Sequence, residues 1–199
     1  SCNFSEILTV FIALMIGWPL PLVALQILWL NLVTDIFPAF ALALEPSSPN
    51  VMSRSPRDPK EALLTPSFIG LIVWQGLLIA GVTLLAFGIG LHWHGIEDEG
   101  LRRATTMAFM TLALSQVFHS FDARSQNRSI FSSRLFTNRW LWGAVAICLL
   151  LQVTAVTLPL LKKVLHTVSP TLWEWGVIAG CSLLPVVVVE LVKIVSRVM

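Results

Sequence analysis

Residues 25–46 read LQILWLNLVTDIFPAFALALEP, and this stretch decides the fold. The run is apolar and long enough to cross a bilayer, yet Asn31, Thr34, Asp35 and Pro38 lie at its centre. A carboxylate at mid-membrane costs a few kcal/mol or more, so a residue of this kind usually has a function. The spacing i, i+3, i+4 predicts that the side-chain oxygens of Asn31, Thr34 and Asp35 share one helix face.

Pro38 adds backbone oxygens to that face. It has no N–H to donate to the carbonyl of Thr34, four residues earlier, and its ring crowds the same turn. Free carbonyls within a membrane have to be satisfied by protein, water or an ion. Carboxylate, amide, hydroxyl and carbonyl oxygens are together the ligands that a hard cation prefers. The stretch therefore predicts half of a cation-binding site.

The composition is typical of an integral membrane protein. The chain has 199 residues, of which 56% are hydrophobic and 12% are charged, and its mean hydropathy is +0.80. Soluble domains carry about twice as large a share of charged residues. No basic patch is dense enough to indicate a nucleic-acid partner. The three cysteines lie in apolar stretches and indicate no disulfide framework.

The apolar segments predict an all-α, polytopic membrane helix bundle that occupies residues 1–199 as a single unit. At about 1.5 Å per residue, a helix over residues 1–17 is shorter than the roughly 30 Å hydrocarbon core. We therefore interpret it as a truncated helix, cut by the N-terminal boundary of a fragment. Five full transmembrane helices are expected, at residues 22–44, 66–91, 104–121, 140–160 and 171–192.

The segments between the expected spans predict the orientation of the bundle. Loops 45–65 and 122–139 and the C-terminal tail carry nine of the 13 Lys and Arg residues, so we expect these three segments to be cytosolic. Residues 92–103 are expected to form a short outer loop. Its His92-x-His94 pair beside acidic residues allows a transition-metal site, but a solvated loop is favoured. Glu190 and Lys193, at i and i+3, are expected to form a structural ion pair.

A resemblance to a known family rests on ordered motifs. Asn31-Leu-Val-Thr34-Asp35, followed by Pro38-Ala39 and Glu45-Pro46, resembles the sixth transmembrane helix of type II P-type cation ATPases, and calcium pumps are the most similar branch. Ile36 departs from the pattern, because calcium pumps usually have Gly after the Asp. Ser1-Cys2-Asn3 with Glu6 resembles the family's fifth helix. Thr106-Met-Ala108 with Ser125-x-Asn127 resembles the eighth, and the resemblance covers essentially all 199 residues.

The resemblance implies a set of cation ligands and an ion. Calcium is the implied transported ion, and the implied ligands are Asn3, Glu6, Asn31, Thr34, Asp35 and Gln116. Gln116 stands where some calcium pumps have a Glu ligand, and a polar bridge between helices is an equal alternative for it. Asn3 by itself would indicate an interhelical hydrogen bond, but beside Glu6 and opposite Asp35 the ligand role is favoured.

The resemblance also implies partners that the chain does not contain. The chain has no Asp-Lys-Thr-Gly-Thr phosphorylation motif and no Gly-rich nucleotide loop, so by itself it is not expected to be catalytic. ATP and Mg²⁺ would bind in cytosolic domains of the same pump. The implied partners are the lipid bilayer, the pump's N-terminal helices, and its phosphorylation domain, which would contact loop 45–65.

Two alternatives to a calcium pump stay open. One is a sodium/potassium-type pump module that carries a monovalent cation, because such pumps also have an Asn and a Glu in the fifth helix. The other is a non-enzymatic membrane scaffold or ion-conducting protein.

Overall fold

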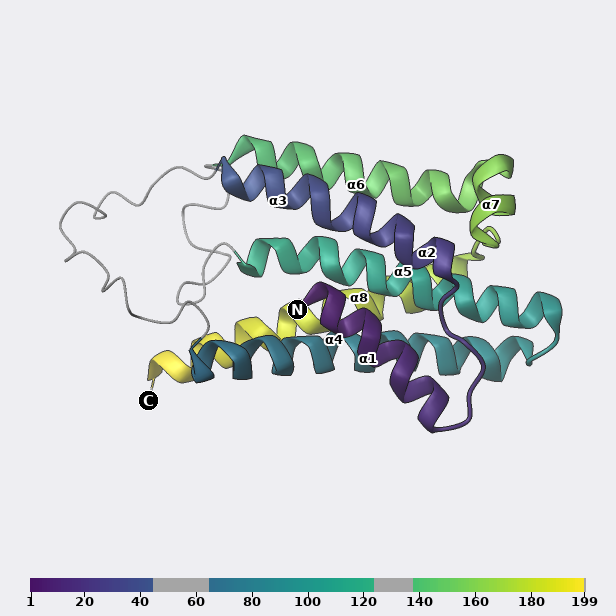
Figure 1. Ribbon diagram of the computed structural model, residues 1–199, viewed down its shortest axis with the longest axis horizontal. Helices are drawn as coiled ribbons and strands as arrows, with labels where there is room; N and C mark the ends of the chain where they lie inside the picture. Colours follow the sequence, from purple (N-terminus) through teal and green to yellow (C-terminus); the bar gives the residue numbers. More distant parts are fainter. Residues whose placement is uncertain (45–64, 124–137, 199) are drawn as a thin grey trace.

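The computed structural model describes residues 1–44, 65–123 and 138–198. All regular elements in these ranges are helices, so the predicted all-α class is confirmed there (Figure 1). They are α1 (Cys2–Met15), α2 (Ala24–Leu30), the π-helix η1 (Asn31–Asp35), α3 (Ile36–Ala43), α4 (Pro66–His94), α5 (Asp98–Ala123), α6 (Arg139–Thr157), α7 (Pro159–Leu165) and α8 (Leu172–Val198). Most of the two expected cytosolic loops, 45–65 and 122–139, lies outside the described residues.

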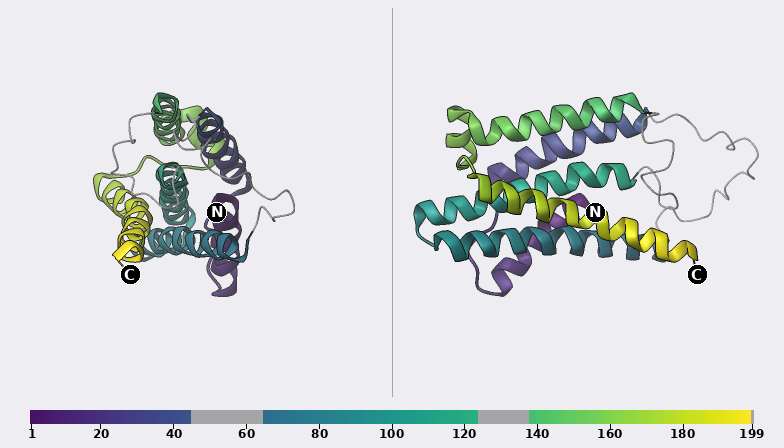
Figure 2. Two further views of the ribbon diagram at one scale, coloured as in Figure 1. Left: turned by 90° about the vertical axis from the view of Figure 1, so that its left-hand side faces the viewer. Right: turned by 180° about the vertical axis from the view of Figure 1, so that it is seen from behind.

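Helix α5 is the central helix of the bundle. In the end-on view, α1, α3, α4, α6 and α8 surround it (Figure 2). Almost every side chain from Ala104 to Ser120 is buried, among them six hydroxyl- or amide-bearing residues. Because its neighbours are helices, α5 can carry polar side chains without presenting them to lipid.

Four helices are long and apolar enough to cross a membrane. They span Ala24–Ala43, Phe68–His94, Arg139–Thr157 and Leu172–Lys193. The expected span 104–121 lies within α5, which is long enough but too polar to be counted with these four, so the prediction of five full spans is confirmed only in part. The short helix expected at 1–17 is α1, with 14 residues.

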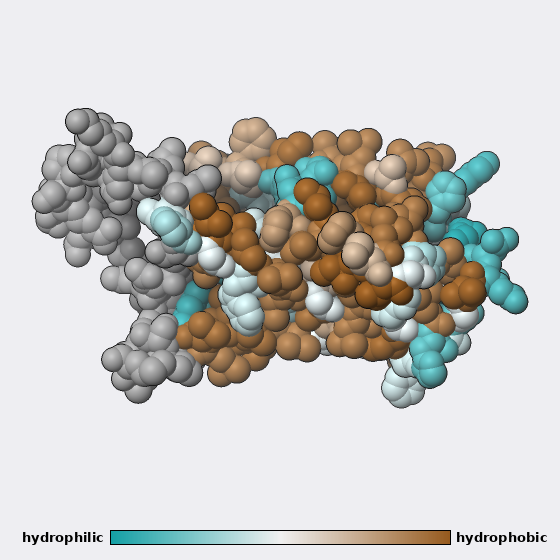
Figure 3. Space-filling view, turned by 60° about the horizontal axis from the view of Figure 1, so that its bottom comes forward, coloured by the Kyte–Doolittle hydropathy of each residue, from teal (hydrophilic) through white to brown (hydrophobic). Residues whose placement is uncertain are grey.

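The exposed surface agrees with burial in a bilayer. The face in Figure 3 is largely hydrophobic along the bundle, and hydrophilic residues gather at its right-hand end. Leu, Ile, Val and Phe side chains that are about half exposed lie along α1, the α2–α3 segment, α4, α6 and α8. Apolar side chains pointing outward are stable in contact with lipid chains and unstable in contact with water.

The expected outer loop 92–103 is mostly helix. α4 continues through His94, α5 begins at Asp98, and Gly95 ends α4 with φ 78, a conformation that glycine adopts at no steric cost. Among the residues that the structure describes, no group of three His, Cys, Asp or Glu side chains is placed to hold a metal ion.

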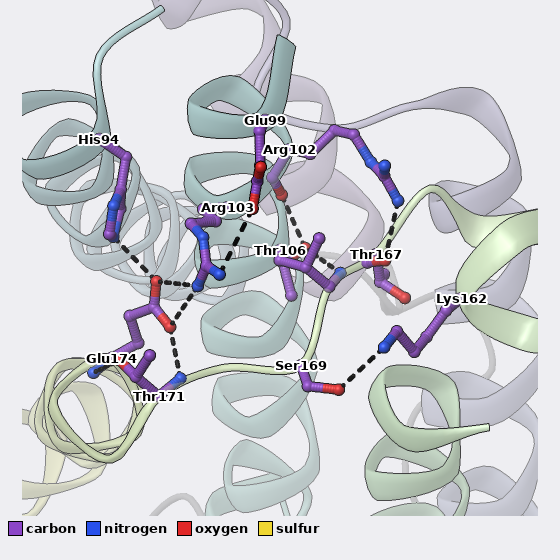
Figure 4. Close-up of polar contacts among 11 residues, drawn as sticks. His94, Glu99, Arg102, Arg103, Thr106, Lys162, Thr167, Ser169, Thr171 and Glu174 are labelled. Carbon is purple, nitrogen blue, oxygen red and sulfur yellow. Dashed lines mark hydrogen bonds and ion pairs between the residues drawn. The ribbon is translucent and has the colours of Figure 1, made fainter. Parts of the chain in front are cut away.

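Glu174 joins three helices at this end of the bundle. Its side chain is only 1% exposed, and its Oε1 lies 2.9 Å from His94 Nε2 of α4 and 3.3 Å from Arg103 Nη1 of α5 (Figure 4). The backbone N–H of Thr171 donates to its other oxygen, Oε2. A buried carboxylate is tolerated where cations and N–H donors surround it, as they do here.

Replacing Glu174 should destabilise the fold, because the Glu174→Ala change leaves Arg103 without its buried partner. We expect a loss of about 2–4 kcal/mol in the free energy of unfolding, measured by thermal denaturation in detergent. Glu99→Ala is the matched control: Glu99 lies 3.6 Å from the same arginine but its side chain is 79% exposed. It should cost less than about 1 kcal/mol. Equal losses for the two variants would contradict this account.

Candidate cation site

The first membrane-crossing helix of the chain changes its geometry at η1. Segments α2, η1 and α3 form one continuous helix, and residues Asn31–Asp35 form its π-helical part. A π-helix bonds i to i+5 instead of i to i+4, and short ones occur frequently at functional sites. Pro38, which is buried in the first turn of α3, cannot donate a backbone hydrogen bond to Thr34. The break in regular bonding that the sequence predicts near Asp35 therefore takes the form of a π-turn.

Three of the predicted site residues meet at the centre of the bundle. Gln116 Nε2 of α5 donates to Oε1 of Glu6 in α1 over 2.9 Å, and Oε1 of Gln116 lies 2.7 Å from the hydroxyl of Thr34. The three residues are 2–4% exposed. The Thr34 hydroxyl is also 2.8 Å from the carbonyl oxygen of Leu30, so its single hydrogen can be donated to either oxygen. One amide thus links α1 to the π-helix through α5.

The other three predicted residues lie around this link without joining it. Asn31 and Asp35 are half-buried at the two ends of η1, and Oδ1 of Asn31 is buried without a hydrogen-bond partner among the described residues. Asn3 is exposed on α1, so the structure does not bring it to the other five. Chemically, two carboxylates beside amide and hydroxyl oxygens favour a cation.

Two residues that the sequence analysis missed hold the π-helix in place. The thiol of Cys148 in α6 donates to the carbonyl oxygen of Val33, within η1, at 3.1 Å. The Oδ1 of Asn138 accepts a hydrogen bond from the N–H of Leu141 at the start of α6, and its Nδ2 donates one to the carbonyl oxygen of Ala41 in α3. An Asn directly before an apolar run is a known N-cap signal, so Asn138 could have been found from sequence. Nothing in the pattern around Cys148 distinguishes it from an ordinary apolar position.

The chain matches a family model across most of its length. Residues 19–195 match the model described as "Cation transporting ATPase, C-terminus". The chain belongs to this family. Membership together with the apolar helices makes it an integral membrane protein, as predicted, and supports the resemblance to type II P-type cation ATPases.

Relatives of this cation-transporting ATPase chain include bacterial and mammalian proteins. It is 39% identical over 184 residues to "Calcium-transporting ATPase 1" of Bacillus cereus, and this match covers 86% of the chain and 21% of that protein. It is 43% identical over 169 residues to "Calcium-transporting ATPase" of Bacillus subtilis, and this match covers 85% of the chain and 18% of that protein. It is 30% identical over 198 residues to human "Calcium-transporting ATPase type 2C member 1", and this match covers 99% of the chain and 21% of that protein. The chain therefore spans about one fifth of the length of these relatives.

Two buried glutamines of this ATPase chain should respond differently to the same substitution. Gln116→Leu leaves the Glu6 carboxylate and the Thr34 hydroxyl without their shared partner and should cost about 1–3 kcal/mol of stability. Gln152 in α6 is 0% exposed, but neither its amide nitrogen nor its amide oxygen has a partner within the described ranges. Gln152→Leu should therefore be neutral or stabilising. Thermal denaturation in detergent without added cation measures both, and a loss at Gln152 equal to that at Gln116 would refute the assigned bonding.

Proposed function

We propose that this chain is the C-terminal part of the membrane domain of an ATP-driven P-type calcium pump, and that it binds the transported Ca²⁺ beside η1. The observation that carries the proposal is the pair of hydrogen bonds by which Gln116 links the Glu6 carboxylate of α1 to the Thr34 hydroxyl of η1, the π-turn of a membrane-crossing helix that also carries Asp35. The printed names of the relatives, all calcium-transporting ATPases, support the choice of ion.

The charge of the site suits a divalent cation. Glu6 and Asp35 together supply two negative charges, and no Lys or Arg side chain in the described part of the chain forms an ion pair with either. The Oδ1 of Asn31, at the start of η1, is buried and has no hydrogen-bond partner among the described residues, so it is a further available oxygen. Calcium prefers six or more oxygen ligands, so the neutral oxygens of Asn31, Thr34 and Gln116 complete the proposed set.

Asn3 is the sixth proposed ligand, and it requires a partner. It lies one turn before Glu6 on α1 but is exposed. We propose that further membrane helices of the pump cover this face of α1 and close the site from that side. Loop 45–65 would contact the phosphorylation domain, where ATP and Mg²⁺ are bound.

The proposed topology has α5 crossing the membrane as a fifth full span, with α1 as the short one. The polar residues of α5 are covered by the surrounding helices, so lipid is not in contact with them. Loops 45–65 and 122–139 and the C-terminus would then face the cytosol, and the end that contains Glu174 would face away from it.

Single-cysteine labelling tests this topology. An impermeant maleimide should label Ser53→Cys and Ser125→Cys from the cytosolic side and Glu97→Cys only from the opposite side. Of the native thiols, those of Cys148 and Cys181 are buried, and Cys2 would be replaced by Ser before the experiment. Labelling of positions 97 and 125 from the same side would show that α5 does not cross.

Asp35→Asn in the complete pump should abolish Ca²⁺-dependent phosphorylation by ATP. Asparagine keeps the size and one oxygen of the side chain, so insertion and thermal stability should persist. What is lost is a full negative charge that faces a cation in a medium of low dielectric constant, where charges interact far more strongly than in water. The measurement is phosphoenzyme formation against Ca²⁺ concentration, with parallel series in sodium and potassium.

Glu97→Gln is the matched control, because it removes an exposed carboxylate at the far end of the bundle. It should keep the Ca²⁺ dependence of the unmodified pump. Gln116→Leu should weaken the dependence less than Asp35→Asn, since Gln116 contributes a dipole rather than a charge. If Asp35→Asn behaves like Glu97→Gln, Asp35 is not a ligand and the proposal fails.

A further inference from the structure

Helix α1 packs on α4 through an aromatic ring that lies directly over a glycine. A Cβ atom built on Gly76 of α4 would lie 2.6 Å from Cδ1 and 3.4 Å from Cε1 of Phe4. Carbon atoms that are not bonded attract each other best at about 3.5–4.0 Å, so no side chain fits at position 76 while Phe4 keeps its place. Gly76 is buried, and it forms a notch that receives the ring.

Not every glycine of α4 forms such a notch. Gly70 and Gly81 lie in the same helix, and a Cβ at either would meet nothing within 4 Å. Gly88 is the second contact with the α1 segment: a Cβ there would be 2.7 Å from Cη2 of Trp18, just beyond the end of α1. Two glycines twelve residues apart thus receive aromatic side chains, one from Phe4 in the first turn of α1 and one from Trp18 just beyond its end, so α1 and α4 run in the same direction along the bundle.

Phe4 is also close to a proposed cation ligand. Glu6 follows it by two residues, and at about 100° per residue the two side chains leave α1 on nearly opposite faces. Phe4 points to α4, and Glu6 points to Gln116 of α5 at 2.9 Å. The hydroxyls of Ser5 and Thr9 bond only to carbonyls of α1 itself, so they do not fix α1 against its neighbours.

We propose that Gly76 is a positioning residue for the cation site: by admitting the Phe4 ring, it sets how far Glu6 lies from Gln116 and η1. This inference rests on the proposed function, because it assigns Glu6 to the ion. An added methyl group at position 76 displaces Phe4 and, with it, the segment of α1 that carries Glu6. A displacement of about 1 Å is enough to break a 2.9 Å hydrogen bond and to distort the coordination of a bound ion.

The test is Ca²⁺-dependent phosphorylation of the complete pump carrying Gly76→Ala. We expect the half-saturating Ca²⁺ concentration to rise about tenfold or more, while the phosphoenzyme level at saturating Ca²⁺ is kept. Gly81→Ala is the matched control on the same helix, since its methyl group enters open space, and it should leave the Ca²⁺ dependence unchanged. Equal half-saturating concentrations in the two variants would overturn the inference.

A second substitution separates positioning from general damage to the fold. Phe4→Leu removes ring atoms from the contact, so the double variant Gly76→Ala/Phe4→Leu should recover most of the lost Ca²⁺ affinity. A shift that Phe4→Leu does not reverse would mean that the notch is not its cause. If Gly76→Ala fails to fold, Phe4→Ala keeps α4 unaltered and should raise the half-saturating concentration by itself. An unchanged value in Phe4→Ala would also overturn the inference.

Glu6→Gln distinguishes the failure of this inference from the failure of the proposed function. If Glu6→Gln raises the half-saturating Ca²⁺ concentration and Gly76→Ala does not, Glu6 belongs to the site but Gly76 does not position it. If Glu6→Gln leaves the Ca²⁺ dependence unchanged, the proposed site is wrong, and the positioning inference falls with it.

Discussion

The hydrogen bonds of Gln116 are the interaction on which the centre of the bundle depends. Hydrocarbon offers no partner to a carboxylate or a hydroxyl, so every polar group at this depth has to be satisfied by the protein or by an ion. A carboxamide has both donors and an acceptor, and Gln116 uses one of each: its Nε2 binds Glu6, and its Oε1 lies next to the Thr34 hydroxyl. An apolar residue at this position would remove the amide donor to the Glu6 carboxylate and leave the Thr34 hydroxyl with only the Leu30 carbonyl oxygen as a partner. The central place of α5 follows from this role, because only a helix in contact with α1 and η1 together can make the link.

The two buried polar clusters of the protein differ in their balance of charge. Around Glu174, the Arg103 guanidinium and the His94 ring compensate the carboxylate, so that cluster holds helix ends together and needs nothing more. Around η1, the Glu6 carboxylate accepts a hydrogen bond from the neutral Gln116 amide, and no Lys or Arg side chain in the described ranges forms an ion pair with Glu6 or Asp35. A compensated cluster contributes to stability, whereas an uncompensated one in low dielectric attracts a cation. The same residue type, Glu, therefore has a structural role at one end and a proposed ion-binding role at mid-membrane.

The sequence predicted the elements that local chemistry controls. Asn31, Thr34, Asp35 and Pro38 indicated an irregular, functional turn in a membrane helix, and η1 lies at those residues. Glu190 and Lys193 were expected to pair, and their side chains lie 3.1 Å apart. The capping pattern Thr171-x-x-Glu174 is also visible in the sequence, and the two residues exchange hydrogen bonds at the start of α8.

Features that depend on how the helices pack together were harder to predict from the sequence. The span expected at 104–121 has the composition of an amphipathic or soluble helix, because its surroundings are protein and not lipid. Residues 92–103 have the polarity of a loop, yet most of them end one helix and begin the next. Asn3 and Glu6, at i and i+3, lie on the same side of α1 by spacing, but only Glu6 is covered by a neighbouring helix, through its hydrogen bond to Gln116 of α5. Glu6 is therefore buried and Asn3 exposed.

The neutrality of Gln116 also limits the ion that the proposed site can hold. A glutamate at this position would bring a third carboxylate next to Glu6, and like charges at hydrogen-bond distance cannot all stay ionised in low dielectric. The Gln116 amide avoids this conflict, because its Nε2–H donates a hydrogen bond to the Glu6 carboxylate and adds no negative charge of its own. The site then carries two negative charges, which one divalent cation neutralises and one monovalent cation leaves unbalanced. Charge balance thus favours a divalent cation over a monovalent one at the site that we propose on the residues that hold α1, α5 and η1 together.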